Sequence, residues 1–232
     1  MPDPIQAVLL DVEGTTTPIA FVRDVLFPFA RARLPELLRT RSDDPAVAAE
    51  LESVRQAAPG ADVLGTLLGW MDADAKQTPL KALQGLLWRE GYASGALRGA
   101  MYPDVAPCLQ RWQGAGLRLF IYSSGSTEAQ RLIFGHSTAG DLTGLLSGYF
   151  DTRVGAKRES GSYRAIAGSI GMAPGAVLFL SDVEAELDAA EAAGFATCQL
   201  VRPEDGTVTS ARHATAATFP EVEGRFGLVG EP

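Results

Sequence analysis

The chain has 232 residues with 20 basic and 28 acidic side chains, so its formal net charge is −8. A chain this acidic is not expected to bind nucleic acid, because affinity for the phosphate backbone comes from positive charge. Its composition, with 46% hydrophobic and 21% charged residues, excludes an intrinsically disordered chain, and its length suits one domain or a core with a smaller inserted domain.

The first predicted element is a buried strand over residues 5–10, which are almost wholly apolar. It ends at a polar loop closed by a proline, residues 11–18, with the sequence Asp-Val-Glu-Gly-Thr-Thr-Thr-Pro. From about residue 20 to residue 99 the pattern is helical, and no strand interrupts it. Within this region we expect helices over 21–39, 45–58 and 78–90.

Strands and helices alternate along the rest of the chain. Apolar segments predict strands over 117–122, 149–152, 177–180 and 195–201. Helical patterns precede or separate them, over 105–113, 128–134, 162–170 and 184–193. This alternation is typical of an α/β fold with a doubly wound parallel sheet. The residues beyond 201 show no clear pattern and are expected to be irregular.

Polar side chains follow three of the predicted strands directly. They are Asp11, Ser123 and Asp182. In an open parallel sheet, ligands bind beyond the carboxyl ends of the strands, where the loops converge. An aspartate or serine in such a place is, taken alone, more often a turn residue or a helix cap than a catalytic group. It is the joint occurrence of the three that indicates a site.

These segments resemble the four motifs of the haloacid dehalogenase-like (HAD) phosphatase superfamily. The first motif, an apolar strand followed by Asp-x-Asp-x-Thr, is matched by residues 11–15, where Glu13 replaces the second aspartate. The other three motifs are matched by Ser123, by Lys157, and by Ser181-Asp182 with Glu186. The resemblance implies a HAD-like core formed by residues 1–18 and 101–232, with residues 19–100 inserted as a helical cap domain.

A narrower resemblance is to the enolase-phosphatase family of methionine salvage. It is carried by residues 11–18 together with 21–28, which read Phe-Val-Arg-Asp-Val-Leu-Phe-Pro. Further segments match in order and spacing, namely 121–126, 134–137, 150–152 and 160–164. This resemblance implies a bifunctional enzyme that converts 2,3-diketo-5-methylthiopentyl-1-phosphate, by enolisation and then dephosphorylation, to the acireductone 1,2-dihydroxy-3-keto-5-methylthiopentene.

The resemblance also implies roles for particular residues. Asp11 would attack phosphorus and form an aspartyl phosphate, and Glu13 would act as general acid and base. Mg²⁺ would be held by the Asp11 carboxylate, the Glu13 carbonyl oxygen and Asp182, since it prefers hard oxygen ligands. The substrate phosphate would be bound by Ser123, Ser124 and Lys157. Glu186 is expected to support the site without binding the metal.

The enolisation needs a group that removes a proton from carbon. Our hypothesis is that Glu13, one methylene longer than the usual aspartate, reaches this proton, while a nearby metal ion stabilises the enediolate. The cap would close over the site and exclude water. Three apolar side chains in it, Trp70, Met71 and Trp88, could line a pocket for a methylthio group, but at helical spacing they are more often core residues.

Several residues also have simpler interpretations. A lysine in a basic, glycine-containing loop such as that of Lys157 is usually solvated, and only the motif match argues otherwise. Ser126 is favoured as a helix cap, and His136 is expected to be structural. Cys108 and Cys198 lie outside any metal-binding or disulfide spacing, so we expect them to be reduced and buried.

Two other functions stay open for the chain as a whole. One is a HAD phosphatase for a different small phosphate ester, against which Glu13 and its threonine-rich setting argue. The other is a non-catalytic phosphate-binding module, against which the presence of all four motifs argues. With no apolar segment of membrane-spanning length and no signal-peptide pattern, we expect a cytoplasmic protein with a small-molecule substrate, no membrane partner and a monomeric state.

Overall fold

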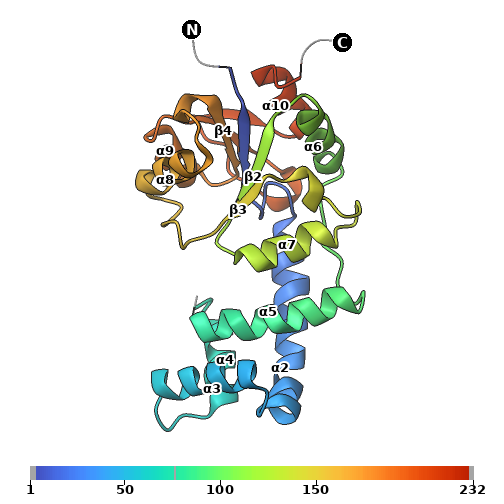
Figure 1. Ribbon diagram of the computed structural model, residues 1–232, viewed down its shortest axis with the longest axis vertical. Coiled ribbons are helices and arrows are strands. Elements are labelled where there is room, and N and C mark those ends of the chain that lie inside the picture. The colour runs from blue at the N-terminus through green and yellow to red at the C-terminus, as the bar shows by residue number, and fades with distance from the viewer. Residues whose placement is uncertain (1–3, 76, 230–232) are drawn as a thin grey trace. The chain divides into compact units, whose positions relative to one another are not determined.

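The computed structural model describes residues 4–75 and 77–229. Its central feature is a six-stranded sheet with the strand order β3-β2-β1-β4-β5-β6, in which every pair of neighbours is parallel (Figure 1). The strands are β1 (Ala7–Leu10), β2 (Arg118–Tyr122), β3 (Gly148–Phe150), β4 (Val177–Ser181), β5 (Ala196–Leu200) and β6 (Ala214–Ala216). The predicted α/β fold with a doubly wound parallel sheet is confirmed.

Helices cover both faces of this sheet. The longer ones are α6 (Val105–Gly114), α7 (Thr127–Gly135), α8 (Ser160–Ile170), α9 (Glu184–Glu191) and α10 (Phe219–Phe226). Helices α8 and α9 lie on one face, and α6 and α10 on the other (Figure 1). Three short 3₁₀ helices complete the core, η2 (Thr143–Leu145), η3 (Pro174–Ala176) and η4 (Pro203–Asp205). Local signals set the helix ends: Ser126 accepts a hydrogen bond from the Ala129 N–H, as expected of a cap, and Gly171 ends α8 at φ +67°.

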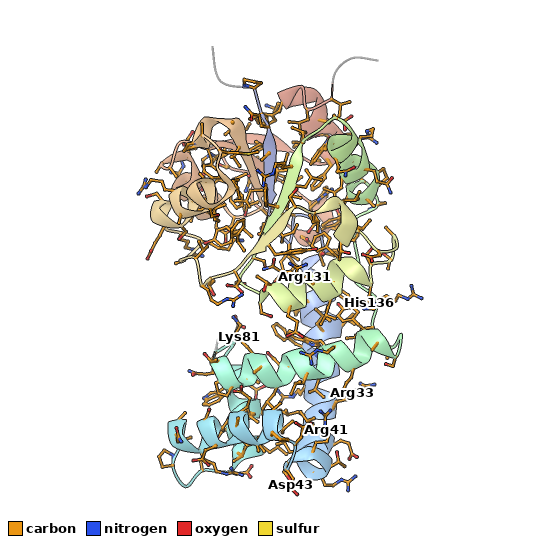
Figure 2. All side chains as sticks on the ribbon, viewed as in Figure 1. Arg33, Arg41, Asp43, Lys81, Arg131 and His136 are labelled. Carbon is orange, nitrogen blue, oxygen red and sulfur yellow. The ribbon has the colours of Figure 1, made fainter. Side chains whose placement is uncertain are left out.

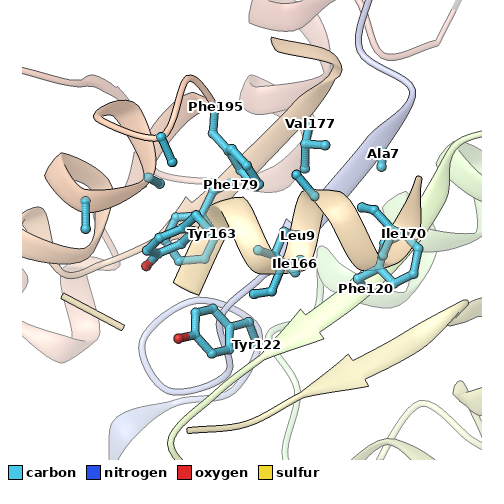
Figure 3. Close-up of a cluster of buried hydrophobic side chains, with 14 of the residues drawn as sticks. Ala7, Leu9, Phe120, Tyr122, Tyr163, Ile166, Ile170, Val177, Phe179 and Phe195 are labelled. Atoms are coloured by element: carbon cyan, nitrogen blue, oxygen red, sulfur yellow. The ribbon is translucent and has the colours of Figure 1, made fainter. Parts of the chain in front are cut away.

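The face under α8 and α9 is packed by large apolar side chains (Figure 3). Alternate residues of β1, β2 and β4 point toward these helices because side chains of a strand alternate between the faces. Tyr163 of α8 is at the centre, with its ring edge-on to Tyr122, Phe179 and Phe195 at centroid distances of 5.6, 5.1 and 5.7 Å. Its hydroxyl donates to the Lys157 carbonyl oxygen at 2.7 Å. The core therefore anchors the loop that carries Lys157.

Residues Ala20–Arg98 form a compact unit separate from the unit that contains the sheet, to which the described residues up to Ile19 and from Gly99 onward belong. The helical segments of this region are α1 (Ile19–Phe21), the π-helix η1 (Val22–Leu26), α2 (Phe27–Arg41), α3 (Pro45–Ala57), α4 (Val63–Asp72) and α5 (Thr78–Ala93). The sequence did not predict α4, since Gly65 and Gly69 lower its helix propensity. Asp62 stabilises its start by accepting a hydrogen bond from the Gly65 N–H at 2.6 Å.

The helical unit has its own apolar core. Leu34, Leu67 and Leu83 are almost or fully buried in it. The side chains of Trp70, Met71 and Trp88 are partly buried and pack against the same cluster, in keeping with the interpretation of them as core residues. The Trp88 indole N–H also donates to the Leu26 carbonyl oxygen at 2.9 Å, at the end of the π-helix.

The prediction that the chain is irregular beyond residue 201 is wrong. This segment adds the edge strand β6 and the helix α10 to the core. Thr218 caps α10 by accepting a hydrogen bond from the Glu221 N–H at 3.4 Å, and the Phe219 ring stacks on Trp112 of α6 at a centroid distance of 5.1 Å. A threonine followed three residues later by a glutamate is a known start signal for a helix. The three-residue strand is too short to show a periodicity.

Both cysteines, Cys108 and Cys198, are free and buried, as expected. Among the residues that the structure describes, no helix is both long and apolar enough to cross a membrane.

Candidate active site

The candidate site lies at the carboxyl ends of β1 and β4. Leu10, the last residue of β1, pairs with Ile121 of β2 and Leu180 of β4. Asp11 therefore leaves the sheet beside the end of β4, which is formed by Ser181 and is followed by Asp182. The chain order runs outward from β1 to β3 on one side and from β4 to β6 on the other, so β1 and β4 flank the topological switch point, where ligands bind in open α/β sheets.

Asp11 is buried, with 5% of its surface exposed, and its carboxylate is held from three sides. Its Oδ1 accepts hydrogen bonds from the Val12 N–H at 2.7 Å and from the Lys157 ammonium at 2.6 Å. The Ser181 hydroxyl oxygen lies 3.4 Å from its Oδ2. Its orientation is therefore fixed by backbone, cation and hydroxyl groups together.

Lys157 lies between two carboxylates and is 9% exposed. Its Nζ is 2.6 Å from Asp11 Oδ1 and 2.6 Å from Glu186 Oε2. Burial alone lowers the pKa of Lys157, but the carboxylates of Asp11 and Glu186 more than offset this and raise the pKa above its ordinary value. The ammonium is therefore charged at neutral pH, and Lys157 is not a solvated loop residue.

The negative charge of the site exceeds its positive charge. Asp11 and Glu186 contact the one ammonium group, that of Lys157, and the carboxyl group of Asp182 lies near enough to be influenced by all three. Burial, together with Asp11 and Glu186, raises the pKa of Asp182 to about 7. Burial and the Asp11 carboxylate also raise the pKa of Glu186 in spite of its contact with Lys157. Buried carboxylates with raised pKa values are typical of functional sites.

This charge imbalance fits a divalent cation. Among the described residues no group of three or more His, Cys, Asp or Glu side chains is arranged to hold a metal ion. The loop after β1 also touches Asp182 directly: a Cβ on Gly14 would be 2.6 Å from Asp182 Oδ2, and its φ of +68° favours glycine as well. The loop of Glu13 and the carboxylate of Asp182 therefore lie together, as a shared Mg²⁺ would require.

Glu13 is half-buried in a tight turn. The N–H groups of Thr15, Thr16 and Thr17 all donate to the Val12 carbonyl oxygen, at 3.3, 2.9 and 2.9 Å. Glu13 forms an isolated bridge with Thr17 across this turn. The backbone around Glu13 is thus closed on itself by hydrogen bonds and forms a stiff loop directly after Asp11.

The serines after β2 are placed differently from one another. Ser123 is buried at 4% exposure, and its hydroxyl accepts a hydrogen bond from the Gly125 N–H at 3.2 Å. Ser124 is exposed. The Ser123 backbone N–H donates to the Phe150 carbonyl oxygen of β3 at 3.2 Å. Ser123 therefore lies at the carboxyl end of the strand next to β1, at the same edge of the sheet as Asp11.

His136 is exposed at the end of α7 (Figure 2). Its backbone N–H donates to the Leu132 carbonyl oxygen at 3.0 Å, and its carbonyl oxygen accepts from the Gly99 N–H at 2.9 Å.

Three residues of the site's surroundings were not assigned from the sequence. The Ser181 hydroxyl bridges Asp11 and Glu186, to whose Oε2 it donates at 3.0 Å. Gln199, which is 1% exposed, donates from Nε2 to the Asp182 carbonyl oxygen at 2.8 Å. Arg202 donates to the Thr15 carbonyl oxygen. Ser181 lies within a recognised motif, but Gln199 and Arg202 lie where the sequence shows no pattern pointing to the site.

The chain is similar in sequence and structure to several known proteins. Residues 5–194 match the model of the haloacid dehalogenase-like hydrolase family. The chain is 61% identical to enolase-phosphatase E1 of Gluconacetobacter diazotrophicus over 97% of this chain and 96% of that protein. It is 57% identical to enolase-phosphatase E1 of Granulibacter bethesdensis over 97% of this chain and 98% of that protein. The UTR4 protein of Saccharomyces cerevisiae has a similar structure, with a TM-score of 0.81 and 34% identity over 92% of this chain and 98% of that one.

Proposed function

The chain belongs to the haloacid dehalogenase-like hydrolases, within the enolase-phosphatase E1 family, and from this premise we propose which of its residues carry out each step. It is a phosphatase with enolase activity that acts in methionine salvage. The substrate we assign to it is 2,3-diketo-5-methylthiopentyl-1-phosphate, and the product is the acireductone 1,2-dihydroxy-3-keto-5-methylthiopentene. The observation that carries the assignment of residues is the buried ammonium of Lys157, 2.6 Å from Asp11 Oδ1 at the end of β1.

Asp11 is the nucleophile of the phosphatase step. Its carboxylate attacks phosphorus, the bond from phosphorus to the substrate oxygen breaks, and an aspartyl phosphate forms. Glu13 gives a proton to the leaving oxygen and later takes one from the water that hydrolyses the aspartyl phosphate. Lys157 offsets the charge of the phosphoryl oxygens, and Ser123 and Ser124 bind the phosphate beside it.

Mg²⁺ would be held by the Asp11 carboxylate, the Glu13 carbonyl oxygen and the Asp182 carboxylate. When bound it supplies Lewis-acid stabilisation of negative charge on the phosphate and on the enolised substrate. The excess of buried carboxylates over ammonium groups supports this assignment, since otherwise the carboxylates would repel the phosphate. Glu186 keeps Lys157 in place through its 2.6 Å contact.

We also assign to Glu13 the removal of the carbon-bound proton of the substrate in the enolisation step. A Glu13→Gln variant is expected to lose phosphate release by about 10²- to 10⁴-fold, because general acid catalysis is removed. A Glu13→Asp variant, one methylene shorter, is expected to slow enol formation more than phosphate release. The two rates are followed by ultraviolet absorbance of the enol and by released phosphate. Wild-type rates of both steps in Glu13→Asp would show that the length of this side chain does not matter.

The metal assignment predicts a pH-dependent effect on stability. Mg²⁺ is expected to raise the unfolding temperature more at pH 8 than at pH 6, because the pKa of Asp182 is raised to about 7 and a proton competes with the metal at the lower pH. In the metal-free protein the same raised pKa destabilises the folded state as the pH rises from about 4 to about 7, since the unfolded chain loses this proton at lower pH.

Calorimetry with and without Mg²⁺ at the two pH values checks this prediction. If one proton competes with the metal, the affinity for Mg²⁺ should be about tenfold higher at pH 8 than at pH 6. An Asp182→Asn variant should lose the Mg²⁺-induced shift at both pH values. A shift of the same size at pH 6 and pH 8 in the wild-type protein would contradict Asp182 as a ligand.

The helical unit, Ala20–Arg98, is inserted between Asp11 and Ser123 in chain order. We assign to it the role of a cap domain that excludes water during enolisation. The protein is further proposed to work as a cytoplasmic monomer on its small phosphorylated substrate, without a nucleic-acid or membrane partner.

The experiment that tests the function is phosphate release from the diketo phosphate with and without Mg²⁺, with absorbance of the enol followed in parallel. Mg²⁺-dependent release preceded by an enol signal is the expected result. Release from generic phosphate esters but not from this substrate would favour a HAD phosphatase of different specificity. No release from any ester would favour a non-catalytic phosphate-binding module.

A further inference from the structure

The segment after β5 sends one buried side chain to the loop that carries Glu13. Arg202 is 3% exposed, and its Nη2 donates to the Thr15 carbonyl oxygen at 2.9 Å. Thr15 is itself fully buried and lies two residues after Glu13. We propose that Arg202 is a positioning residue of the enzyme, which holds the loop of residues 11–18 so that Glu13 is correctly placed. The inference rests on the catalytic role proposed above for Glu13.

The guanidinium of Arg202 is fixed on several sides. Its Nη1 donates to Asp104 Oδ1 and Oδ2 at 3.1 and 2.9 Å and to the Ala217 carbonyl oxygen at 3.1 Å. Its Cζ atom lies 4.1 and 5.4 Å from the ring centroids of Tyr102 and Phe219. Because the donors of a guanidinium form a rigid planar fork, these contacts also fix the direction of the Nη2 bond toward the loop.

Hydrogen bonds within the loop couple the position of Thr15 to that of Glu13. Its turn is closed by the hydrogen bonds to the Val12 carbonyl oxygen, and the Gly14 N–H donates to the Thr17 carbonyl oxygen at 2.8 Å. A displacement of Thr15 therefore displaces Glu13 with it. The loop is also anchored at Thr16, whose carbonyl oxygen accepts from the Tyr102 N–H at 3.1 Å.

The segment after β5, called here the C-terminal segment, makes a second contact at Ile19, the residue that follows the loop. Asp205 Oδ2 accepts hydrogen bonds from the Tyr102 hydroxyl and from the Ile19 N–H, the latter at 3.3 Å. Arg202 and Asp205 thus contact the two ends of the stretch from Thr15 to Ile19. This arrangement gives the C-terminal segment a direct influence on the position of Glu13.

The effect of the Arg202–Asp104 pair on the position of Glu13 can be separated from its effect on the stability of the fold. A buried Arg–Asp pair adds little net stability compared with groups of the same size without charge, because desolvation offsets the attraction. A reacting group, in contrast, loses much of its effect when it is displaced by about 1 Å. Replacement of the whole pair should therefore leave the fold nearly intact and lower the catalytic rate.

The test uses the full-length enzyme with Mg²⁺ and the diketo phosphate. In the double variant Arg202→Met/Asp104→Asn the charged pair is removed, while the asparagine can still accept the hydrogen bond of the Phe219 N–H. We expect kcat per folded molecule to fall at least about tenfold with KM within about twofold, as for a group that acts mainly in the transition state. A single variant, Arg202→Ala, should regain part of its kcat when millimolar guanidinium is added.

Arg111→Ala is the matched control. Arg111 of α6 pairs with Glu223 of α10 at 3.1 Å, so it joins the same two helices that flank the Arg202 contacts, and its other side-chain hydrogen bonds go to Pro107 and Cys108 of α6. The kcat of the Arg111→Ala variant should stay at the wild-type value.

The proposal is overturned if kcat per folded molecule is unchanged in the double variant, so that any loss of activity follows the loss of folded protein. Absence of guanidinium rescue in an inactive but folded Arg202→Ala variant also counts against it. Glu13→Gln distinguishes this failure from a failure of the proposed function. If Glu13→Gln retains wild-type activity, the role of Glu13 is wrong, whereas an inactive Glu13→Gln beside fully active Arg202 variants refutes the positioning role alone.

Discussion

An Asp11→Asn variant is expected to lose phosphate release by on the order of 10⁴-fold or more, because an amide cannot replace the carboxylate as the nucleophile. The fold should be retained. An asparagine oxygen can still accept the hydrogen bond of the Val12 N–H, and Lys157 keeps its contact with Glu186. Removal of one negative charge from the buried cluster should also stabilise the metal-free protein near pH 8, since it relieves repulsion between carboxylates.

The measurement is a single-turnover assay with phosphorus-labelled substrate and acid quench. Wild-type enzyme should show label bound covalently to the protein, and Asp11→Asn should show none. Asp151→Asn is the matched control, because Asp151 is also a buried aspartate after a strand of this sheet but binds Arg153 and Thr127 instead. Covalent label in Asp11→Asn, or a loss of activity in Asp151→Asn of similar size, would contradict the assignment of the nucleophile.

Replacement of Lys157 by methionine is expected to have the second-largest effect. The variant loses the buried cation that faces both Asp11 and Glu186 at 2.6 Å. Loss of a preorganised charge beside the phosphoryl group typically costs about 10²- to 10³-fold in kcat. Because two buried carboxylates are left without their cation, the free energy of unfolding should also fall near pH 8, by about 3–5 kcal/mol.

The pH dependence of this loss of stability is a sharper test than its size. Without Lys157 the pKa of Glu186, which burial and the Asp11 carboxylate already raise, rises further, so at lower pH this carboxyl binds a proton and its repulsion with Asp11 is relieved. The variant should therefore lose less stability at pH 6 than at pH 8, as measured by denaturant unfolding. Arg158→Met is the control, since it removes the neighbouring exposed cation. If Lys157→Met lowered the free energy of unfolding no more than Arg158→Met does, Lys157 would be only a surface charge.

Much of this protein was predictable from local patterns in the sequence. The apolar runs before Asp11, Ser123 and Asp182 are strands in the structure, and the helices expected between them are present together with α4, which was not expected. Such patterns are reliable because a strand buried on both faces needs a continuous apolar segment, and its carboxyl end must meet a polar loop. The parallel order of the sheet follows from the alternation of strands and helices.

The sequence was less informative where elements are short or weakly patterned. Helix α4 contains two glycines and was not predicted, and the strand β6 spans three residues. Their stability comes from neighbouring elements: Leu67 is buried in the core of the helical unit, and β6 pairs along the edge of β5. Tertiary packing of this kind outweighs local propensity.

The residue types of the candidate site were visible in the sequence, but their interactions were decided by the tertiary structure alone. Only the fold buries Lys157 between Asp11 and Glu186, and only the fold brings Arg202 to the carbonyl oxygen of Thr15. These groups are far apart along the chain, and no periodicity encodes a contact between separate loops. The sequence by itself thus determined five of the six strands, the residues at the strand ends and the family. Burial and packing determined the charge balance of the site and the anchoring of the Glu13 loop.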